Sequence, residues 1–393
     1  MKVMILKSIW QGMPPIATLR EATLTFGADK KYATFDRTGR LLFYTEPGLA
    51  IRRGLDHRMV ESTESPSGRS YRDMSEAEKK ALIEAVRGGI HLQLSVNGVA
   101  DRLHRKLEQI EAWTPEQLAL DHDKFYSLYR PISILPPDQY RSLVVQVAEG
   151  CSYNRCLFCD FYRDRPFHIK SDQELSSHLE GIKAFFGERL IDRSGIFLGD
   201  GNALVIPTLR LLTILQKIKQ ELPPALFQSG VATFMDTFSL ERKSLEELRI
   251  LRDAGMQAVY VGFETGADSL REFLRKQGTA QEALSAMTTL KQAGYQLAVI
   301  ILVGAGGREF ADRHVKDTLS TLAKLPLQRG DLIYLSPFVE PVHTGYTETA
   351  TSAGLEALPE AKLNEEYEFL RQELQLMHPE AKVTRYSILQ HLY

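Results

Sequence analysis

From residue 143 onward the sequence alternates between short apolar runs and longer stretches with helical periodicity. Six of the runs have the length of a β-strand: 143–147, 195–198, 226–231, 258–262, 297–303 and 332–336. Alternating strands and helices predict a parallel sheet with right-handed crossovers, and continuous apolar strands predict burial on both faces. A doubly wound sheet and a partial barrel both satisfy this pattern. In either fold ligands bind at the carboxyl ends of the strands, so the residues that follow each run are the candidate site residues.

The boundaries of the expected helices carry capping signals. Three helix starts have Ser or Thr followed three residues later by Glu, the spacing of a capping box: Ser171 with Glu174, Ser244 with Glu247, and Thr279 with Glu282. Gly255 and Gly294 each follow a helical run and precede an apolar run, as a glycine C-cap does. Helix ends and strand starts therefore alternate regularly through this part of the chain.

The first 140 residues have a different pattern and predict a separate mixed α/β region. Residues 31–45 hold β-rich runs on either side of a turn signal, which predicts a hairpin. Residues 61–72 are polar and contain a proline and a glycine, which predicts an exposed loop. Helix starts follow at Ser75 and Thr114. A Leu-Pro-Pro sequence at 135–137 then breaks the chain, so we expect the domain boundary near residue 140.

Charge and hydropathy exclude several classes of protein. The chain has 48 Lys and Arg against 50 Asp and Glu, a net charge of -2, which argues against a generally basic surface that coats nucleic acid. No stretch approaches the 18 or more apolar residues of a membrane span, and residues 1–12 lack the apolar core of a signal peptide. We therefore expect a cytoplasmic protein without a membrane partner.

The three cysteines of the chain, Cys151, Cys156 and Cys159, follow directly on the first apolar run. An odd, clustered count fits metal ligation better than a disulfide framework. Three thiolates can hold three irons of a four-iron cluster and leave the fourth iron open, whereas electron-transfer clusters use four cysteines. The alternative is a zinc site with a distant His as fourth ligand, which would make the chain a zinc-stabilised, non-enzymatic binding protein.

The cysteine segment, with Phe158 before its last cysteine, resembles the radical SAM superfamily, whose usual motif is C-x3-C-x2-C after the first strand of a partial (β/α)6 barrel. The chain departs from that motif by one extra residue between Cys151 and Cys156, so we assign no subfamily. The resemblance covers roughly residues 143–345. It implies an α/β fold with a partial (β/α)6 TIM-like barrel at 141–345, between the N-terminal region at 1–140 and a C-terminal helical extension at 346–393.

The resemblance also implies two cofactors, a [4Fe-4S] cluster on the three cysteines and S-adenosyl-L-methionine, with Phe158 against the adenine. The other implied cofactor contacts follow the second, fourth and fifth apolar runs: Gly199, Asp200, Gly201, Glu264, Gly304 and Gly306. On the residues alone, the glycines also suit tight turns and Glu264 also suits a helix N-terminus. Four residues past the cysteines could bind an anionic group or lie in solvent: Tyr162, Arg163, Arg165 and His168. No catalytic residue is assigned.

The resemblance predicts an enzyme that cleaves S-adenosylmethionine reductively to a 5′-deoxyadenosyl radical, which abstracts hydrogen from an unidentified substrate. Its partners would be that substrate and a low-potential electron donor such as flavodoxin or ferredoxin. The chain has no cysteines for a second cluster and no cobalamin-binding signature. An alternative is an RNA- or tetrapyrrole-modifying member, with residues 1–140 as the recognition module. A basic stripe of Arg102, Arg105 and Lys106 motivates the RNA version, although the net charge does not favour nucleic acid.

Overall fold

The structure is a computed structural model that describes residues 10, 16–65, 68–94, 100–237 and 243–393. The chain divides into two compact units. The first comprises Met1–Pro131, Gly181–Asp192 and Leu389–Tyr393, and the second comprises Ile132–Glu180 and Arg193–Ile388. The domain boundary near residue 140 and a separate extension at 346–393 stay predictions.

The first unit contains a seven-stranded antiparallel meander in which each strand pairs with the next along the chain. Its elements are β1 (Ile16–Leu19), β2 (Thr23–Ala28), β3 (Lys31–Asp36), β4 (Leu41–Glu46), β5 (Leu49–Arg53), β6 (Met59–Ser65), β7 (Gly68–Asp73), α1 (Glu76–Leu94), α2 (Asp101–Glu111) and α3 (Pro115–Leu128). Apolar side chains of β2 to β6 pack against α1, α2 and α3 to form its core. The predicted hairpin is confirmed as β3 and β4.

The exposed loop predicted at 61–72 is wrong, because the described residues of this range, 61–65 and 68–72, belong to the paired strands β6 and β7. Opposite charges face each other across the two strands. Arg72 lies 2.8 Å from Glu61, and Arg69 lies 2.5 Å from Glu64. Such cross-strand pairs stabilise a hairpin whose side chains are exposed. The polar composition of this segment therefore indicates two solvent-exposed strands at the edge of the sheet, and not a loop.

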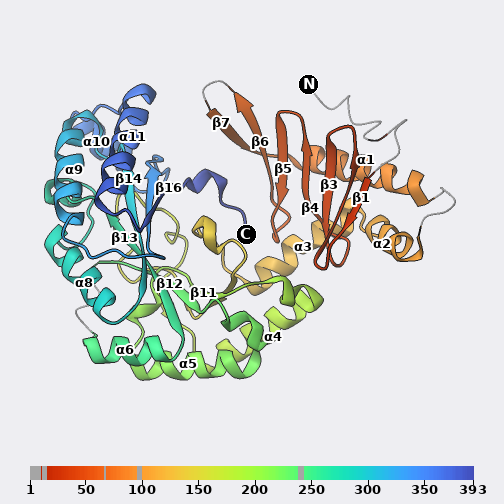
Figure 1. Cartoon of the computed structure of the whole chain (residues 1–393), viewed down its shortest axis with the longest axis horizontal. Coiled ribbons are helices and arrows are strands. Elements are labelled where there is room, and N and C mark those ends of the chain that lie inside the picture. Colours follow the sequence, from red (N-terminus) through yellow and green to blue (C-terminus); the bar gives the residue numbers. More distant parts are fainter. Residues whose placement is uncertain (1–9, 11–15, 66–67, 95–99, 238–242) are drawn as a thin grey trace. The chain divides into compact units, whose positions relative to one another are not determined.

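The second unit is built on a seven-stranded parallel sheet whose strand order follows the chain order. Its strands are β8 (Leu143–Gln146), β11 (Ile196–Gly199), β12 (Val231–Met235), β13 (Met256–Glu264), β14 (Gln296–Val303), β15 (Leu332–Pro337) and β16 (Lys382–Arg385). Its helices are α4 (Asp172–Phe186), α5 (Thr208–Glu221), α6 (Leu245–Asp253), α7 (Asp268–Phe273), α8 (Ala280–Gln292), α9 (Gly307–Leu322), α10 (Tyr346–Ser352) and α11 (Glu360–Met377). A doubly wound sheet reverses its strand order, and this sheet does not. Figure 1 shows the helices around the outside of the strands, so the fold is a partial TIM-like barrel.

Two details of the predicted strands are wrong. The third strand lies at Val231–Met235 and not at 226–231, because Pro223 and Pro224 start a 3₁₀ turn that takes up Leu226. A seventh strand, Lys382–Arg385, pairs with β15 inside the region that was predicted to be a helical extension. The parallel sheet therefore has one strand more than was predicted.

The predicted helix boundaries are confirmed. Complete capping boxes begin α6 at Ser244 and α8 at Thr279. The backbone N–H of Ser171 donates to the Glu174 carboxylate over 2.7 Å at the start of α4. Gly255 and Gly294 have φ values of 110° and 88°, the left-handed conformation that glycine adopts at little cost. Each cap fixes where the following strand begins, and thus where its carboxyl end lies.

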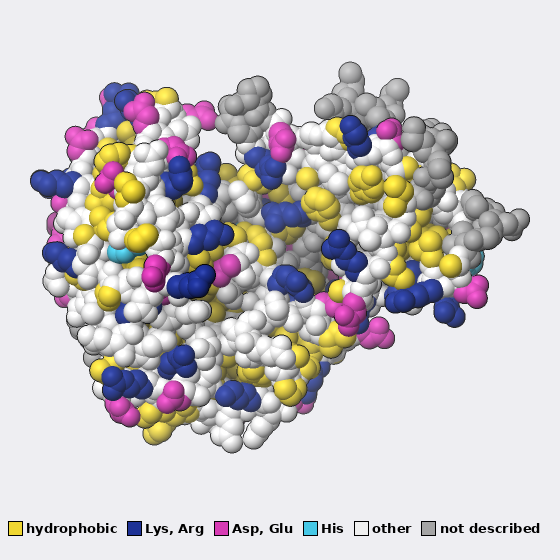
Figure 2. All heavy atoms as spheres, in the orientation of Figure 1, with side chains coloured by type: hydrophobic (Ala, Val, Ile, Leu, Met, Phe, Trp, Pro, Cys, Tyr) yellow, Lys and Arg dark blue, Asp and Glu magenta, His cyan; other side chains and the backbone are white. Residues whose placement is uncertain are grey.

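No helix among the described residues is both long enough and apolar enough to span a bilayer. On the face drawn in Figure 2, acidic side chains lie among the basic ones over both units. Of the basic stripe on α2, Lys106 is used internally: its ammonium donates to the backbone oxygen of Arg37 over 2.7 Å.

Candidate active site

A cavity in the second unit lies at the carboxyl ends of the barrel strands, where the parallel pattern predicts a site. All three cysteines line it. So do Asp236, directly after β12, and Glu264, the last residue of β13. The loop after β8 therefore brings the cysteines against the ends of several other strands.

The cysteine loop is held at its base by a short antiparallel pair, β9 (Ala148–Glu149) with β10 (His168–Ile169). Within the loop, Asn154 has a φ of 49° and its backbone N–H donates to the Cys151 sulfur over 3.4 Å. Its side-chain amide donates to the Tyr162 carbonyl over 2.7 Å. Asn tolerates this left-handed conformation better than most residues. The longer spacer after Cys151 is thus accommodated by a residue suited to a tight turn.

The four residues that follow the cysteines do not form one anion-binding group. The Arg163 guanidinium donates to the Cys156 carbonyl over 2.8 Å. Arg165 is buried, and its Nε donates to the Asp200 carboxylate over 3.0 Å. Tyr162 lines the cavity, whereas His168 contacts Glu174 at 3.0 Å in an exposed pair. The two arginines therefore hold the loop in shape.

Burial raises the pKa of the Cys156 thiol to about 11 and that of the Cys159 thiol to about 12. The nearby Lys276 ammonium opposes the shift of Cys156. Cluster ligands are thiolates, and a bound metal supplies the positive charge that stabilises them. These thiols are thus neutral without a metal, and metal binding would release their protons.

The donor set fits a four-iron cluster. Across the described parts of the chain, no three His, Cys, Asp or Glu side chains meet closely enough to hold a single ion. A four-iron cluster requires something else, three thiolates that bind three different irons and surround the cluster. Cys151, Cys156 and Cys159 are free thiols that line one cavity, and the chain has no fourth cysteine. One iron would therefore lack a protein thiolate.

The three cofactor contacts implied after the second apolar run, Gly199, Asp200 and Gly201, do not all reach the cavity. Gly201 lines the cavity, and a Cβ there would lie 3.2 Å from the Cα of Cys151. Gly199 and Asp200 are not among the lining residues. The buried Asp200 carboxylate accepts hydrogen bonds from Arg165 and from the Gly150 backbone N–H, over 3.0 and 3.1 Å. Its contacts therefore tie the cysteine loop to the end of β11.

Glu264 and Phe158 both line the cavity, as the predicted contacts require. Lys276, which sequence reasoning missed, joins them: its ammonium lies 3.5 Å from the Glu264 carboxylate and 5.8 Å from the centre of the Phe158 ring. Burial raises the pKa of Glu264, and Lys276 opposes that shift. A Cβ on Gly262 would come within 2.5 Å of the Glu264 carboxylate, so this glycine makes room for the pair.

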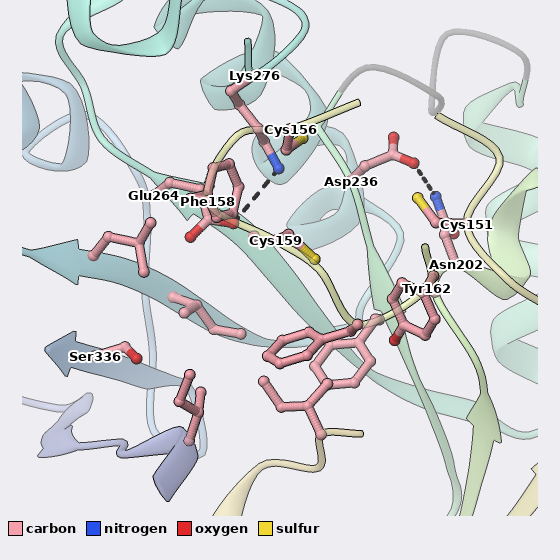
Figure 3. A pocket seen from close by; sticks show the side chains of 18 of the residues that line it. Cys151, Cys156, Phe158, Cys159, Tyr162, Asn202, Asp236, Glu264, Lys276 and Ser336 are labelled. Carbon is pink, nitrogen blue, oxygen red and sulfur yellow. Dashed lines mark hydrogen bonds and ion pairs between the residues drawn. The ribbon is translucent and has the colours of Figure 1, made fainter. Parts of the chain in front are cut away.

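A second polar pair was also missed, Asn202 with Asp236. The Asn202 amide donates to the Asp236 carboxylate over 2.8 Å. Figure 3 shows the two pairs on either side of the cysteines, with Cys156 next to Lys276 and Cys151 next to Asn202. The run Val231–Met235 is β-branched and aromatic, a strand signal that would have placed Asp236 at a strand end.

Gly304 and Gly306 do not line the cavity. A Cβ on Gly304 would meet Leu363 of α11 at 2.3 Å, and one on Gly306 would meet Leu270 of α7 at 2.5 Å. Both have φ values above 80°. Close packing and backbone conformation thus account for these glycines. Leu302 of β14, the strand that precedes them, does line the cavity.

Arg271 of α7 connects the segments that carry the polar pairs. It is 1 % exposed, and its side chain donates five hydrogen bonds. The acceptors are the carbonyls of Phe263, Thr265, Gln277 and Gly278 and the Thr237 hydroxyl. These lie next to Glu264, Lys276 and Asp236 in the chain. A guanidinium has five N–H donors in a fixed plane, so Arg271 holds the three segments in a fixed relation.

The chain is similar to several known proteins. The chain is 21 % identical over 192 residues to the heme chaperone HemW of Bacillus subtilis (strain 168), a match that covers 47 % of this chain and 48 % of that protein. The chain thus spans about half the length of this curated relative. Coproporphyrinogen III oxidase HemN from Escherichia coli is similar in structure, with a TM-score of 0.45 and 15 % identity over 59 % of this chain and 52 % of that one. Elp3 of Methanocaldococcus infernus has a TM-score of 0.41 and 12 % identity, covering 62 % and 56 %.

The family model that describes the radical SAM superfamily matches residues 145–322. This range begins inside β8, includes the cysteine loop and ends with α9. Enzymes of this family bind a [4Fe-4S] cluster and S-adenosylmethionine. Residues 145–322 of the chain thus form a radical SAM domain.

Proposed function

We propose that Cys151, Cys156 and Cys159 hold a [4Fe-4S] cluster with one open iron, and that the cavity beside them binds S-adenosylmethionine. With cluster and cofactor bound, the site would supply one-electron reductive cleavage to a 5′-deoxyadenosyl radical that abstracts hydrogen from a substrate. The observation that carries the proposal is that all the thiols of the chain line one cavity at the carboxyl ends of the strands. An external low-potential donor such as flavodoxin or ferredoxin would provide the electron, in a cytoplasmic protein.

The polar residues of the cavity suit a cationic cofactor. S-adenosylmethionine carries a sulfonium and an ammonium group besides its carboxylate. The carboxylates of Asp236 and Glu264 both line the cavity, and Lys276 is the one cation among its described lining residues. Opposite charges attract strongly in a partly buried site, so these two carboxylates would bind and orient the cationic part of the cofactor. Lys276 pairs with Glu264 and would hold that carboxylate in position.

The apolar residues of the cavity would exclude water from the reacting atoms. Phe158, Phe161, Phe234 and Phe338 all line it. Water exclusion strengthens electrostatic contacts inside a site and prevents side reactions of reactive species. The chain thus provides both the charged and the dry surface that radical chemistry requires.

The test is anaerobic reconstitution with iron and sulfide, followed by reaction with S-adenosylmethionine and dithionite. The native chain should turn brown and release 5′-deoxyadenosine. Cys156→Ala should lose both properties, because it removes one of three ligands. Ser152→Ala, an exposed position in the same loop, is the matched control and should keep both. An intact cluster without 5′-deoxyadenosine release would contradict the proposal.

A second candidate function, tetrapyrrole handling, rests on the match to the heme chaperone HemW. In this version the chain binds heme or modifies a related tetrapyrrole. Titration with hemin, followed by the Soret absorption, tests it. A saturable complex with one heme per chain would support the second candidate, and only nonspecific, unsaturable binding would rule it out.

A further inference from the structure

Three exposed arginines lie on or beside the cysteine loop of the second unit. Arg155 and Arg163 belong to the loop, and Arg275 follows α7. We call these three residues the arginine patch. The Tyr153 hydroxyl donates to the Arg275 carbonyl over 2.9 Å, which joins the loop to the end of α7. Burial raises the pKa of Tyr153, and the charges of Arg155 and Arg275 are among those that oppose the shift, so both charges act at the same place.

The positive charge of the arginine patch exceeds the negative charge around it. Within the described residues, none of the three arginines forms an ion pair. The acidic residues within 152–164 and 272–276 are Asp160, Asp164 and Glu272. The Asp164 carboxylate lies 2.8 Å from the guanidinium of the buried Arg165 and is therefore already paired. The arginines thus outnumber the acids that remain, on a chain whose net charge is -2.

Arg163 connects the arginine patch to the proposed cluster ligands. Its Nη2 donates to the Cys156 carbonyl over 2.8 Å, and its Nε donates to the Cys159 carbonyl over 3.4 Å. None of the three arginines lines the cofactor cavity, so the patch and the cavity are separate surfaces of the same loop. A molecule bound to the patch would therefore touch a side chain that is hydrogen-bonded to two of the cysteine residues, without entering the cavity.

We propose that the arginine patch is the docking surface for the electron donor, a small protein with an acidic surface and a low-potential one-electron carrier. This inference rests on the proposed function, because it assumes a cluster on the three cysteines. The donor would lose one electron, and the cluster would gain it and pass from [4Fe-4S]2+ to [4Fe-4S]+. Opposite surface charges bring two proteins together faster and fix their orientation. A nucleic acid would also bind arginines, but it has no need of contact with cluster ligands.

The test uses the reconstituted protein and a flavodoxin whose sequence has a large excess of acidic residues. Bleaching of the cluster by the flavodoxin hydroquinone gives the rate of reduction, and titration calorimetry with oxidised flavodoxin gives the affinity. Arg155→Glu/Arg275→Glu should slow reduction and weaken binding at least about tenfold at low ionic strength. The loss should shrink in 1 M salt, where the screening length is about 3 Å. Arg155→Gln and Arg275→Gln should each give a smaller loss, so the test does not depend on one variant.

Lys324→Glu/Arg329→Glu is the matched control, because it changes the net charge by the same amount. Both positions are exposed and lie between α9 and β15, before the amino end of that strand. This variant should bind flavodoxin and be reduced as the native protein is. If the two double variants behave alike, or if flavodoxin neither binds nor reduces the native protein, the docking surface is wrong. Tighter binding of a short single-stranded RNA than of flavodoxin, lost in Arg155→Glu/Arg275→Glu, would assign the patch to nucleic acid and overturn the proposal too.

Excess dithionite separates this inference from the proposed function, because it reduces the cluster without a protein partner. With dithionite, Arg155→Glu/Arg275→Glu should hold as much iron and release as much 5′-deoxyadenosine as the native protein. If the native protein releases 5′-deoxyadenosine but the variant loses nothing with flavodoxin, the docking surface is wrong and the proposed function stands. If the variant loses reduction by flavodoxin as expected but the native protein releases no 5′-deoxyadenosine, the docking surface stands and the proposed function is wrong.

Discussion

The hydrogen bond from Arg271 to Thr237 offers a sharp test of how the polar residues are positioned. Thr237→Val keeps the shape of the side chain and removes the acceptor of the 2.9 Å bond from Arg271 Nη2. A hydrogen bond to a charged group contributes about 1.5–3 kcal/mol. Nη2 keeps a longer bond to the Gln277 carbonyl, at 3.3 Å. We therefore expect a loss of about 1.5 kcal/mol in the free energy of unfolding, the lower end of that range.

Urea unfolding measures this loss. Trp10 and Trp113 are the tryptophans of the chain, and both lie in the first unit. Their fluorescence follows that unit, while far-ultraviolet circular dichroism follows both. Thr213→Val is the matched control, since Thr213 is exposed and its hydroxyl donates to the Leu209 carbonyl of its own helix. Thr237→Val should lower the midpoint of the circular dichroism transition with an unchanged slope. If the two variants unfold alike, the positioning role of Arg271 is refuted.

Two further substitutions test buried carboxyl groups. Burial raises the pKa of Glu366 to about 7. Between the ordinary pKa of a glutamate and that value, the folded state therefore binds more protons than the unfolded state. The free energy of unfolding thus falls as the pH rises through this window. Glu366→Gln should remove this loss of stability, which amounts to up to about 3 kcal/mol, and it keeps an acceptor for the Gly304 N–H. Urea unfolding at pH 4.5 and pH 8 measures the loss in both proteins. An equal pH dependence of the native protein and the variant would count against a buried Glu366 carboxyl. Asp200→Asn should cost about 1.5–3 kcal/mol, because it removes the buried carboxylate that pairs with Arg165, although Asp164 still pairs with the same guanidinium. It should also reduce the iron retained after reconstitution. If Asp200 serves only to bind the cofactor ammonium, iron content and stability will instead match the native protein.

Local sequence signals predicted the helix boundaries and most of the barrel. Capping boxes at Ser244 and Thr279 and the C-cap at Gly255 depend on residues within one turn, so the sequence shows them directly. Glu264 was expected in the cavity because it follows the fourth apolar run and because the family resemblance implied a cofactor contact there, and it does line the cavity. The cysteines could also be identified from the sequence alone, because all three lie within nine residues of one another.

The predictions that were wrong or missing concern residues whose structure depends on distant partners, or a strand whose start was placed a few residues too early. The third strand was predicted at 226–231, so its expected end came before its true end at Met235. Asp236 was therefore not recognised as a residue at a strand end. Lys276 follows a short helix and enters the cavity through its pairing with Glu264, which no local pattern indicates. The strand Lys382–Arg385 is polar and partly exposed, and it becomes a strand by pairing with β15. Tertiary pairing decided its structure, not its own propensity.

Electron paramagnetic resonance of the reduced, reconstituted protein tests the central claim most directly. If one iron lacks a protein thiolate and lies at the cavity, adding S-adenosylmethionine should change the signal of the reduced cluster, and the change should saturate at one cofactor per chain. A signal that is unaltered by excess S-adenosylmethionine would mean that no iron is open to it, and the account of this site would be wrong.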